Sequence, residues 1–220
     1  MPFDLFDPSG DLHVIEGGSL PHWFQPGVTY FVTIRTADSV PRELADEWYW
    51  RRNDWLARHG IRPTDPNWSR ALARLPSARQ SEYHRTFSTE FLAYLDRGYG
   101  GCFLRRPDLA RIVGSALAHF DAERYDLGDY VVMPNHIHLL VGLRGGLDIV
   151  RQCYSWKKYA ATKINRRLGR SGRFWQEESF DHLVRSPEQL EYLRRYIAEN
   201  PAAAGLQPGE YLYYRREDML

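Results

Sequence analysis

Apolar residues recur along this chain with two spacings, one typical of strands and one typical of helices. Val28–Arg35 is rich in β-branched and aromatic residues, so we expect a strand there. Asp129–Met133 and Ile137–Leu143 are strongly apolar and are separated by a Pro-Asn dipeptide, which predicts two further strands. Two more short extended segments are expected at Arg173–Gln176 and Ser179–Arg185.

Helical spacing governs most of the remaining chain. Pro107–Tyr125 and Asp148–Leu168 repeat apolar residues at intervals of three and four, which predicts two amphipathic helices. Ser186 begins another helix with a Ser-x-x-Gln capping box, and the following proline should end that helix near Asn200. Pro41 to about Arg97 is also expected to be helical, with breaks at glycine and proline.

The order of these elements predicts the fold class. Without residues 41–97 the order is strand, helix, two strands, helix, strand, helix. It favours an α+β fold of the ferredoxin-like or RRM-like kind, with an antiparallel sheet and helices on one face. At 220 residues the chain fits one domain. We therefore expect a single domain over residues 1–220, with a helical insertion at about 41–97.

Composition narrows the class of protein. The chain is 43% hydrophobic and 26% charged, close to the averages for globular proteins. It has no apolar run long enough to span a membrane, and its acidic beginning is unlike a signal peptide. Cys102 and Cys153 match neither a metal pair nor a disulfide framework. We expect a cytoplasmic protein with two reduced thiols and no membrane partner.

Positive charge is concentrated in one segment, although the formal net charge is only +1. No acidic residue lies between Asp148 and Glu177, while aromatic residues are interleaved with the cations. Such a segment is either a solvated helix face or a surface that binds phosphates while aromatic rings stack on bases. The aromatic candidates for stacking are Tyr154, Tyr159, Phe174 and Trp175, whereas Trp156 falls on the apolar stripe and is expected in the core. The cations are Arg151, Lys157, Lys158, Lys163, Arg166, Arg167, Arg170 and Arg173.

A His-x-His pair lies in the predicted strand after Pro134. Side chains alternate along a strand, so His136 and His138 should point to one face and Ile137 to the other. Two adjacent neutral imidazoles can chelate a divalent metal. The pattern by itself is weak, because such pairs also arise by chance.

One face of the last predicted helix carries Tyr192, Tyr196 and Asn200, four residues apart. A tyrosine one turn before an amide could serve as a nucleophile beside a metal held by two histidines. Periodicity alone does not distinguish Tyr196 from Tyr192, and helical tyrosines usually pack with a satisfied hydroxyl.

Several motifs together resemble a known family. The run VVMPNHIHLLV at Val131–Val141 is similar to the His-hydrophobic-His strand of the HUH single-tyrosine transposases, particularly the REP-associated tyrosine transposases of bacteria. The similarity spans roughly residues 26–206. Its other motifs are Gly101–Leu104, Trp156-Lys157-Lys158, Gly172–Gln176, Phe180-Asp181-His182, Tyr196-Ile197 with Asn200-Pro201, and Ala204-Gly205-Leu206.

The resemblance implies a role for each matching residue. Tyr196, and not Tyr192, matches the nucleophile, while His136 and His138 match ligands of Mg²⁺ or Mn²⁺. Asn200 matches the position that completes the coordination, although its amide could instead cap the helix end. The resemblance also implies cleavage and rejoining of single-stranded DNA at palindromic, REP-like hairpins through a 5′-phosphotyrosine, in the nucleoid, by a monomer or homodimer. The residues expected to bind DNA are Arg151, Lys157, Lys158, Lys163, Arg166, Arg167 and Arg173.

Other functions stay open at this point. A protein with this fold could bind palindromes without turnover, as a repressor or architectural protein. A replication or conjugation nickase usually carries more histidines or further domains. A metal hydrolase that activates water would leave no covalent protein–DNA product.

Overall fold

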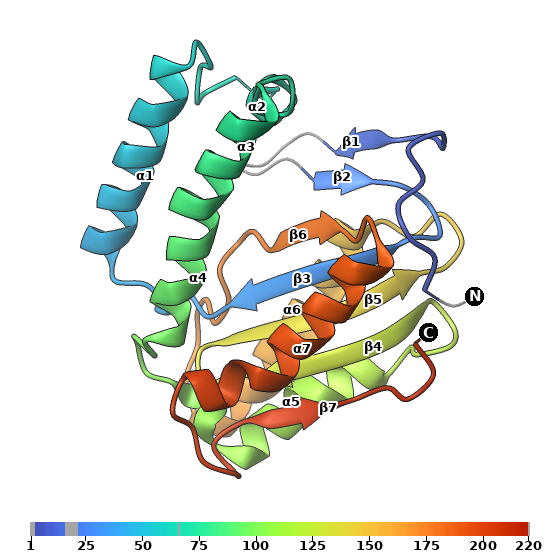
Figure 1. Cartoon of the computed structure of the whole chain (residues 1–220). Helices are drawn as coiled ribbons and strands as arrows, with labels where there is room; N and C mark the ends of the chain where they lie inside the picture. Colours follow the sequence, from blue (N-terminus) through green and yellow to red (C-terminus); the bar gives the residue numbers. More distant parts are fainter. Residues whose placement is uncertain (1–2, 16–21, 66, 220) are drawn as a thin grey trace.

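The computed structural model describes residues 3–15, 22–65 and 67–219, and its centre is a five-stranded antiparallel sheet. The strand order is β6-β3-β5-β4-β7, so β5 lies in the middle (Figure 1). A separate pair, β1 (His13–Ile15) and β2 (His22–Phe24), forms a small second sheet. The strands of the main sheet are β3 (Thr29–Arg35), β4 (Tyr125–Val132), β5 (His136–Leu143), β6 (Phe180–Leu183) and β7 (Leu212–Tyr214).

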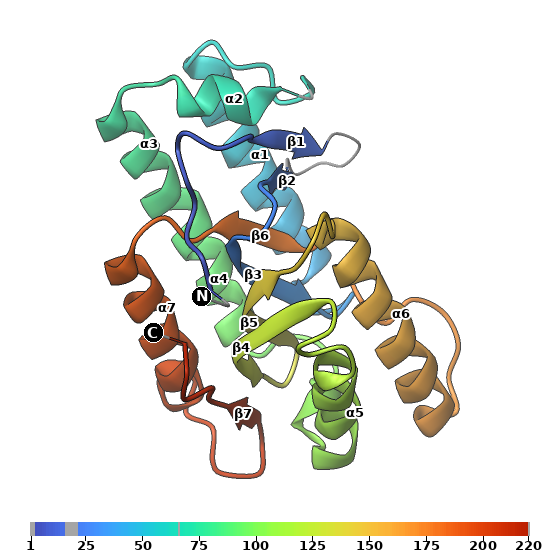
Figure 2. The same cartoon turned by 90° about the vertical axis from the view of Figure 1, so that its right-hand side faces the viewer.

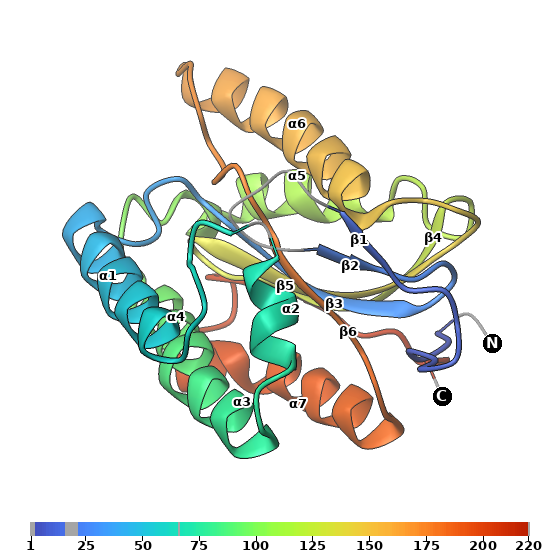
Figure 3. The same ribbon diagram turned by 90° about the horizontal axis from the view of Figure 1, so that it is seen from above.

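Helices cover both faces of this sheet. On one face α5 (Pro107–Ala118) and α6 (Ile149–Leu168) share an apolar cluster with the strands, whereas α7 (Pro187–Ala203) packs on the other (Figures 2 and 3). The predicted α+β class and antiparallel sheet are confirmed. The prediction placed the helices on one face, which is correct for α5 and α6 but not for α7. The second layer forms because β5 is buried along its whole length and needs cover on both sides.

Two predicted helix ends differ from the structure. The helix expected to reach Tyr125 ends at Ala118, and Tyr125 instead begins β4 with its hydroxyl donating to the Leu117 carbonyl at 2.7 Å. The last helix continues past its expected end at Asn200 to Ala203, with Pro201 inside its final turn. A proline there removes a single backbone hydrogen bond and leaves the rest of the helix intact.

The capping signals explain where the long helices begin. Ser186 accepts a hydrogen bond from the Gln189 amide at 3.2 Å, as the capping box predicts. The Gln189 side chain accepts from the Arg185 amide rather than from the amide of Ser186. At the start of α6, Asp148 accepts from the Val150 amide at 2.7 Å, and this helix ends at the left-handed Gly169.

Residues 42–96 form a helical region between β3 and α5 with its own apolar cluster, which includes Trp48, Leu56 and Phe87. One long helix of this region changes its winding, because a five-residue π-helical turn lies between α3 and α4. The short 3-10 helix η2 (Phe103–Arg105) follows. The helices are α1 (Arg42–Arg58), α2 (Trp68–Ala73), α3 (Ser77–Tyr83), the π-turn η1 (His84–Ser88) and α4 (Thr89–Asp96).

The predicted strand at 173–176 is reduced to an isolated bridge between Trp175 and Thr36, because the segment meets only the end of β3. Cys102 and Cys153 are free thiols. Among the described residues, none of the helices combines the length and apolar character that crossing a bilayer requires.

Candidate functional site

The two histidines lie on the central strand, on the face that α7 covers. His138 is paired with Thr33 of β3 and Val131 of β4, so strands flank it on both sides. Both imidazoles are fully buried, and their ring centroids are 4.6 Å apart. Ile137 belongs to the opposite apolar cluster, as strand alternation predicts.

Hydrogen bonds fix the orientation of the His136 ring. The Asn135 amide nitrogen donates to the carbonyls of Leu95 and Tyr99 at 3.2 and 3.1 Å, so its oxygen faces His136. That oxygen lies 2.8 Å from Nδ1 of His136 and can only accept, so Nδ1 carries the proton. Nε2 of His136 is therefore left with a lone pair, the form in which imidazole binds a metal.

Burial keeps both imidazoles neutral. It lowers the pKa of His136 to about 3 and the pKa of His138 well below its usual value, with the neighbouring His136 as a smaller cause. Nδ1 of His138 lies 2.8 Å from the Thr33 hydroxyl, and Nε2 of His138 faces α7. A buried neutral imidazole pair has the right protonation state for metal binding at neutral pH.

Tyr196 projects from α7 onto the histidine pair. Its hydroxyl is 3.4 Å from Nε2 of His138, and its ring meets that imidazole edge-on with centroids 5.2 Å apart. Tyr192, one turn earlier, is 58% exposed and stacks on Tyr196 at 6.5 Å. Geometry therefore distinguishes the two tyrosines where periodicity did not, since only Tyr196 reaches the imidazoles.

The environment of Tyr196 holds its proton tightly. Burial raises the pKa of Tyr196, the nearby Asp96 carboxylate raises it further, and a hydrogen bond with Asn200 acts in the opposite direction. The phenol is protonated at neutral pH in this state, so any attack by its oxygen requires that a neighbouring group or solvent remove the proton.

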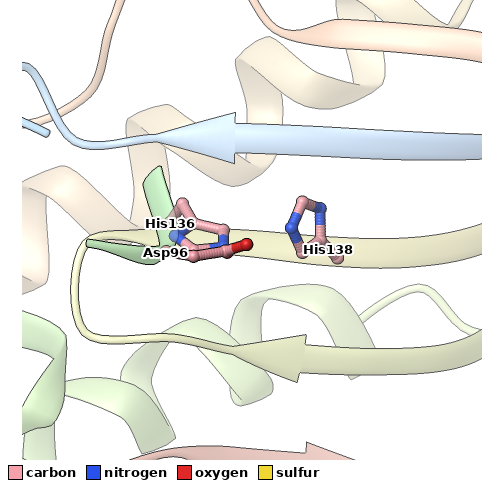
Figure 4. A group of neighbouring side chains, drawn as sticks. All are labelled: Asp96, His136 and His138. Atoms are coloured by element: carbon pink, nitrogen blue, oxygen red, sulfur yellow. The ribbon is translucent and has the colours of Figure 1, made fainter. Parts of the chain in front are cut away.

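A carboxylate from the helical region joins the two imidazoles at the site. Asp96 ends α4, and its carboxylate lies beside His136 and His138 with the ligand atoms of all three within 4.8 Å of one another (Figure 4). Burial raises the pKa of Asp96 to about 6, with a hydrogen bond from Asn200 acting the other way. Sequence reasoning missed Asp96, because no motif singles out an aspartate forty positions before the pair.

Asn200 lies at the same site, one turn after Tyr196. Its side chain is buried, and its Oδ1 atom has no hydrogen-bond partner among the described residues. Nε2 of His136 and Oδ1 of Asp96 are likewise buried without a hydrogen-bond partner. Unpaired buried acceptors are costly, and a cation among these atoms would satisfy them. The donor set therefore fits a divalent metal.

A buried ion pair fixes α7 to the sheet. Arg194 donates from Nε to Asp129 of β4 at 2.9 Å and from a terminal nitrogen to the Arg216 carbonyl at 2.9 Å. Asp129 also accepts from the Arg216 amide at 2.8 Å. Since Arg194 precedes Tyr196 by two residues, this pair holds the helix that carries the tyrosine.

The predicted DNA-binding residues lie on α6 and the segment after it, on the opposite side of the sheet from Tyr196 (Figure 3). Lys158 and Lys163 are exposed and lie over the rings of the exposed Tyr154 and Tyr159. DNA that touches both these lysines and Tyr196 must pass around an edge of the sheet. Arg151 and Arg166 are exposed too.

Other members of the basic segment are engaged within the protein. Lys157 donates to the Glu177 carbonyl at 2.6 Å, Arg167 pairs with Asp108 at 3.0 Å, and Arg173 lies 3.4 Å from Glu177. The expectation that Phe174 and Trp175 stack on bases is wrong for this structure, because both are buried in the core between α6 and the sheet. Trp156 is buried there as expected.

Part of the chain is similar to known proteins. Residues 106–200 match the family model described as transposase IS200 like. None of the curated proteins matches the chain. A solved structure, described as a REP-associated tyrosine transposase bound to a REP hairpin, is similar at 16% identity and a TM-score of 0.41, covering 84% of this chain and 73% of that one. The family match agrees with the resemblance inferred from the motifs: the matched residues 106–200 hold the histidine pair and Tyr196.

Proposed function

We propose that this protein is a metal-dependent strand transferase that cleaves and rejoins single-stranded DNA at palindromic hairpins, with Tyr196 as the nucleophile. The observation that carries the proposal is the contact between the Tyr196 hydroxyl and Nε2 of His138, 3.4 Å apart within a segment of the transposase family. The tyrosine, the histidine pair and Asn200 all come from one chain. This arrangement supports catalysis within a single subunit.

The reaction exchanges one phosphoester bond for another. The phenolic oxygen of Tyr196 bonds to phosphorus and loses its proton, while the bond to the 3′ oxygen of the DNA breaks and that oxygen gains a proton. The products are a 5′-phosphotyrosine and a free 3′-hydroxyl. A 3′-hydroxyl of another strand can attack the phosphotyrosine in the same way, so rejoining needs no ATP.

His136 and His138 would hold a Mg²⁺ or Mn²⁺ ion, with Asn200 as a further ligand, and a bound ion supplies charge stabilisation at the phosphate. The protein contributes a stiff central strand that orients both imidazoles and a helix that positions the tyrosine. The exposed cations of α6, such as Lys158 and Lys163, are proposed to bind the DNA backbone on the far side of the sheet.

A second candidate is a protein that binds palindromic hairpins without turnover. One observation favours it: burial raises the pKa of Tyr196, and a protonated phenol is a weak nucleophile. Such a protein would use the exposed basic surface of α6 and leave the buried site idle.

One experiment separates the two candidates. The purified protein is incubated with Mn²⁺ and a single-stranded hairpin labelled on the 3′ side of the cleavage site, and products are separated under denaturing conditions. We expect a labelled protein–DNA adduct that Tyr196→Phe abolishes and the matched control Tyr192→Phe retains. Adduct formation by both variants would overturn the assignment of the nucleophile. Tight hairpin binding without any adduct in Mg²⁺ or Mn²⁺ would favour the binding protein.

A further inference from the structure

The helical region and the histidine pair meet at one buried contact. Oδ1 of Asp96, at the end of α4, lies 3.7 Å from Nε2 of His136. Both atoms are inaccessible to solvent and neither has a hydrogen-bond partner among the described residues. The contact is therefore neither a hydrogen bond nor a solvated ion pair.

The protonation states make this contact unfavourable without a cation. Nδ1 of His136 carries the ring proton, because it faces the Asn135 oxygen, so Nε2 presents a lone pair. The carboxylate oxygen of Asp96 also presents lone pairs. Two acceptors that face each other in a buried place repel, unless a positive charge lies between them.

The charge of the site leads to the same conclusion. An imidazole binds a metal in its neutral form, so the two histidines alone would leave a dication uncompensated in a buried place. Within the described ranges, the only group of three possible His, Cys, Asp or Glu ligands is that of Asp96, His136 and His138 (Figure 4). A carboxylate also favours Mg²⁺ and Mn²⁺, whereas a site built of imidazole alone suits zinc better.

We propose that Asp96 is a direct ligand of the metal, so that the helical region of residues 42–96 completes the catalytic centre. This inference rests on the proposed function, and it adds a residue outside the segment that matches the transposase family. Asn200 stays a further ligand beside Asp96, since its Oδ1 atom is buried at the same site without a hydrogen-bond partner among the described residues.

A structural consequence follows from the position of Asp96. The Asn135 amide already binds the carbonyls of Leu95 and Tyr99, on either side of Asp96. A metal held by Asp96 and the histidines adds a second connection between α4 and β5. Metal binding should therefore stabilise the end of α4 against local opening.

The test measures Mn²⁺ binding to the full-length protein by electron paramagnetic resonance, without DNA. We expect Asp96→Asn, which keeps the shape of the side chain, to weaken Mn²⁺ binding by at least about tenfold. Zn²⁺ affinity should fall less, because the imidazoles remain. The matched control is Asp46→Asn, which removes a carboxylate from an exposed ion pair on α1 and should leave both affinities unchanged.

Hydrogen exchange with and without Mn²⁺ gives a second readout. The amides of residues 93–99 should gain protection in the wild-type protein and in Asp46→Asn, but not in Asp96→Asn. Wild-type Mn²⁺ affinity in Asp96→Asn, together with a loss of affinity in His136→Ala, would overturn the role of Asp96 and leave the proposed function standing. If the wild-type protein binds no Mn²⁺, both the ligand assignment and the metal dependence of the proposed function fail.

Discussion

The two faces of the sheet are built from the same strands but differ in what they bury. Facing α5 and α6, the strands contribute apolar residues such as Val32, Leu139 and Val141 to a large cluster. The face toward α7 has a smaller apolar cluster around Phe31 and Leu140, interrupted by the histidine pair. Alternation along β5 separates the two environments by a single residue.

The difference indicates that one face of the sheet mainly stabilises the fold while the other holds the candidate site. Apolar burial dominates the α5 and α6 face, where the few polar groups, such as the Tyr125 hydroxyl and the Trp156 indole nitrogen, are hydrogen-bonded to each other at 2.9 Å. On the α7 face, buried acceptors of His136, Asp96 and Asn200 stay unpaired among the described residues, which costs stability and is typical of a binding site. The same face also buries the ion pair of Arg194 with Asp129, in which either charge would be costly to leave without its partner.

The largest effect on the α7 face is expected from removing the ion pair that holds α7 to the sheet. We expect Arg194→Met to lower the free energy of unfolding by about 3–5 kcal/mol, because it leaves the Asp129 carboxylate buried without its partner. Urea unfolding measures this change. The double variant Arg194→Met with Asp129→Asn should lose less, since the charge is gone while an acceptor for the Arg216 amide remains. Equal losses in the two variants would contradict the explanation.

A second prediction concerns the orientation of His136. Asn135→Ala removes the acceptor that faces Nδ1 of His136 and both hydrogen bonds to the end of α4. We expect Mn²⁺ affinity to fall about 10–100-fold, the usual effect of losing a partner of a metal-binding histidine, as measured by calorimetry. Asn165→Ala is the control, because it removes a comparable amide contact, to the Gly172 carbonyl, on α6. An equal effect in the control would show that the loss is not specific to the α7 face.

The smallest expected effect lies on the outer surface of α6. Replacing Lys158 and Lys163 with alanine should weaken single-stranded DNA binding and reduce the steepness of its salt dependence by about 0.7 for each phosphate that the protein no longer neutralises. Fluorescence anisotropy at several salt concentrations measures that slope. Removing two cations from α1, with Arg42→Ala and Arg58→Ala, is the control for net charge and should leave the slope unchanged. If both pairs change it equally, α6 is not a specific DNA surface.

Much of the site was predictable because its signals are local. Strand alternation places His136 and His138 on one face, and helical spacing places Tyr196 and Asn200 one turn apart. The choice of Tyr196 over Tyr192 came from the family motif, and its nearness to the imidazoles depends on how α7 lies on the sheet. That packing is a long-range property which spacing does not encode.

Other features depend wholly on tertiary packing. Asp96 reaches the histidines only because the helical region folds back on β5, and no sequence motif near Asp96 predicts this contact. The basic segment was correctly seen as a cluster, but the side of the sheet on which it lies follows from the apolar stripe of α6 and the strand order. Phe174 and Trp175 were misjudged because an aromatic pair between cations resembles a stacking surface as much as a core.

The π-helical turn η1 affects the direction in which the Asp96 side chain points. Its five residues join α3 to α4, and α4 is rotated about the helix axis relative to where an uninterrupted α-helix would place it. A π-helical turn holds about one residue more than an α-helical turn, because its hydrogen bonds join residues five apart instead of four. Deleting one residue at η1 would therefore let this stretch wind as ordinary α-helix, with little rotation between α3 and α4. An insertion of one residue in α4 itself would instead rotate the Asp96 carboxylate by about 100° around the helix axis, away from the imidazoles.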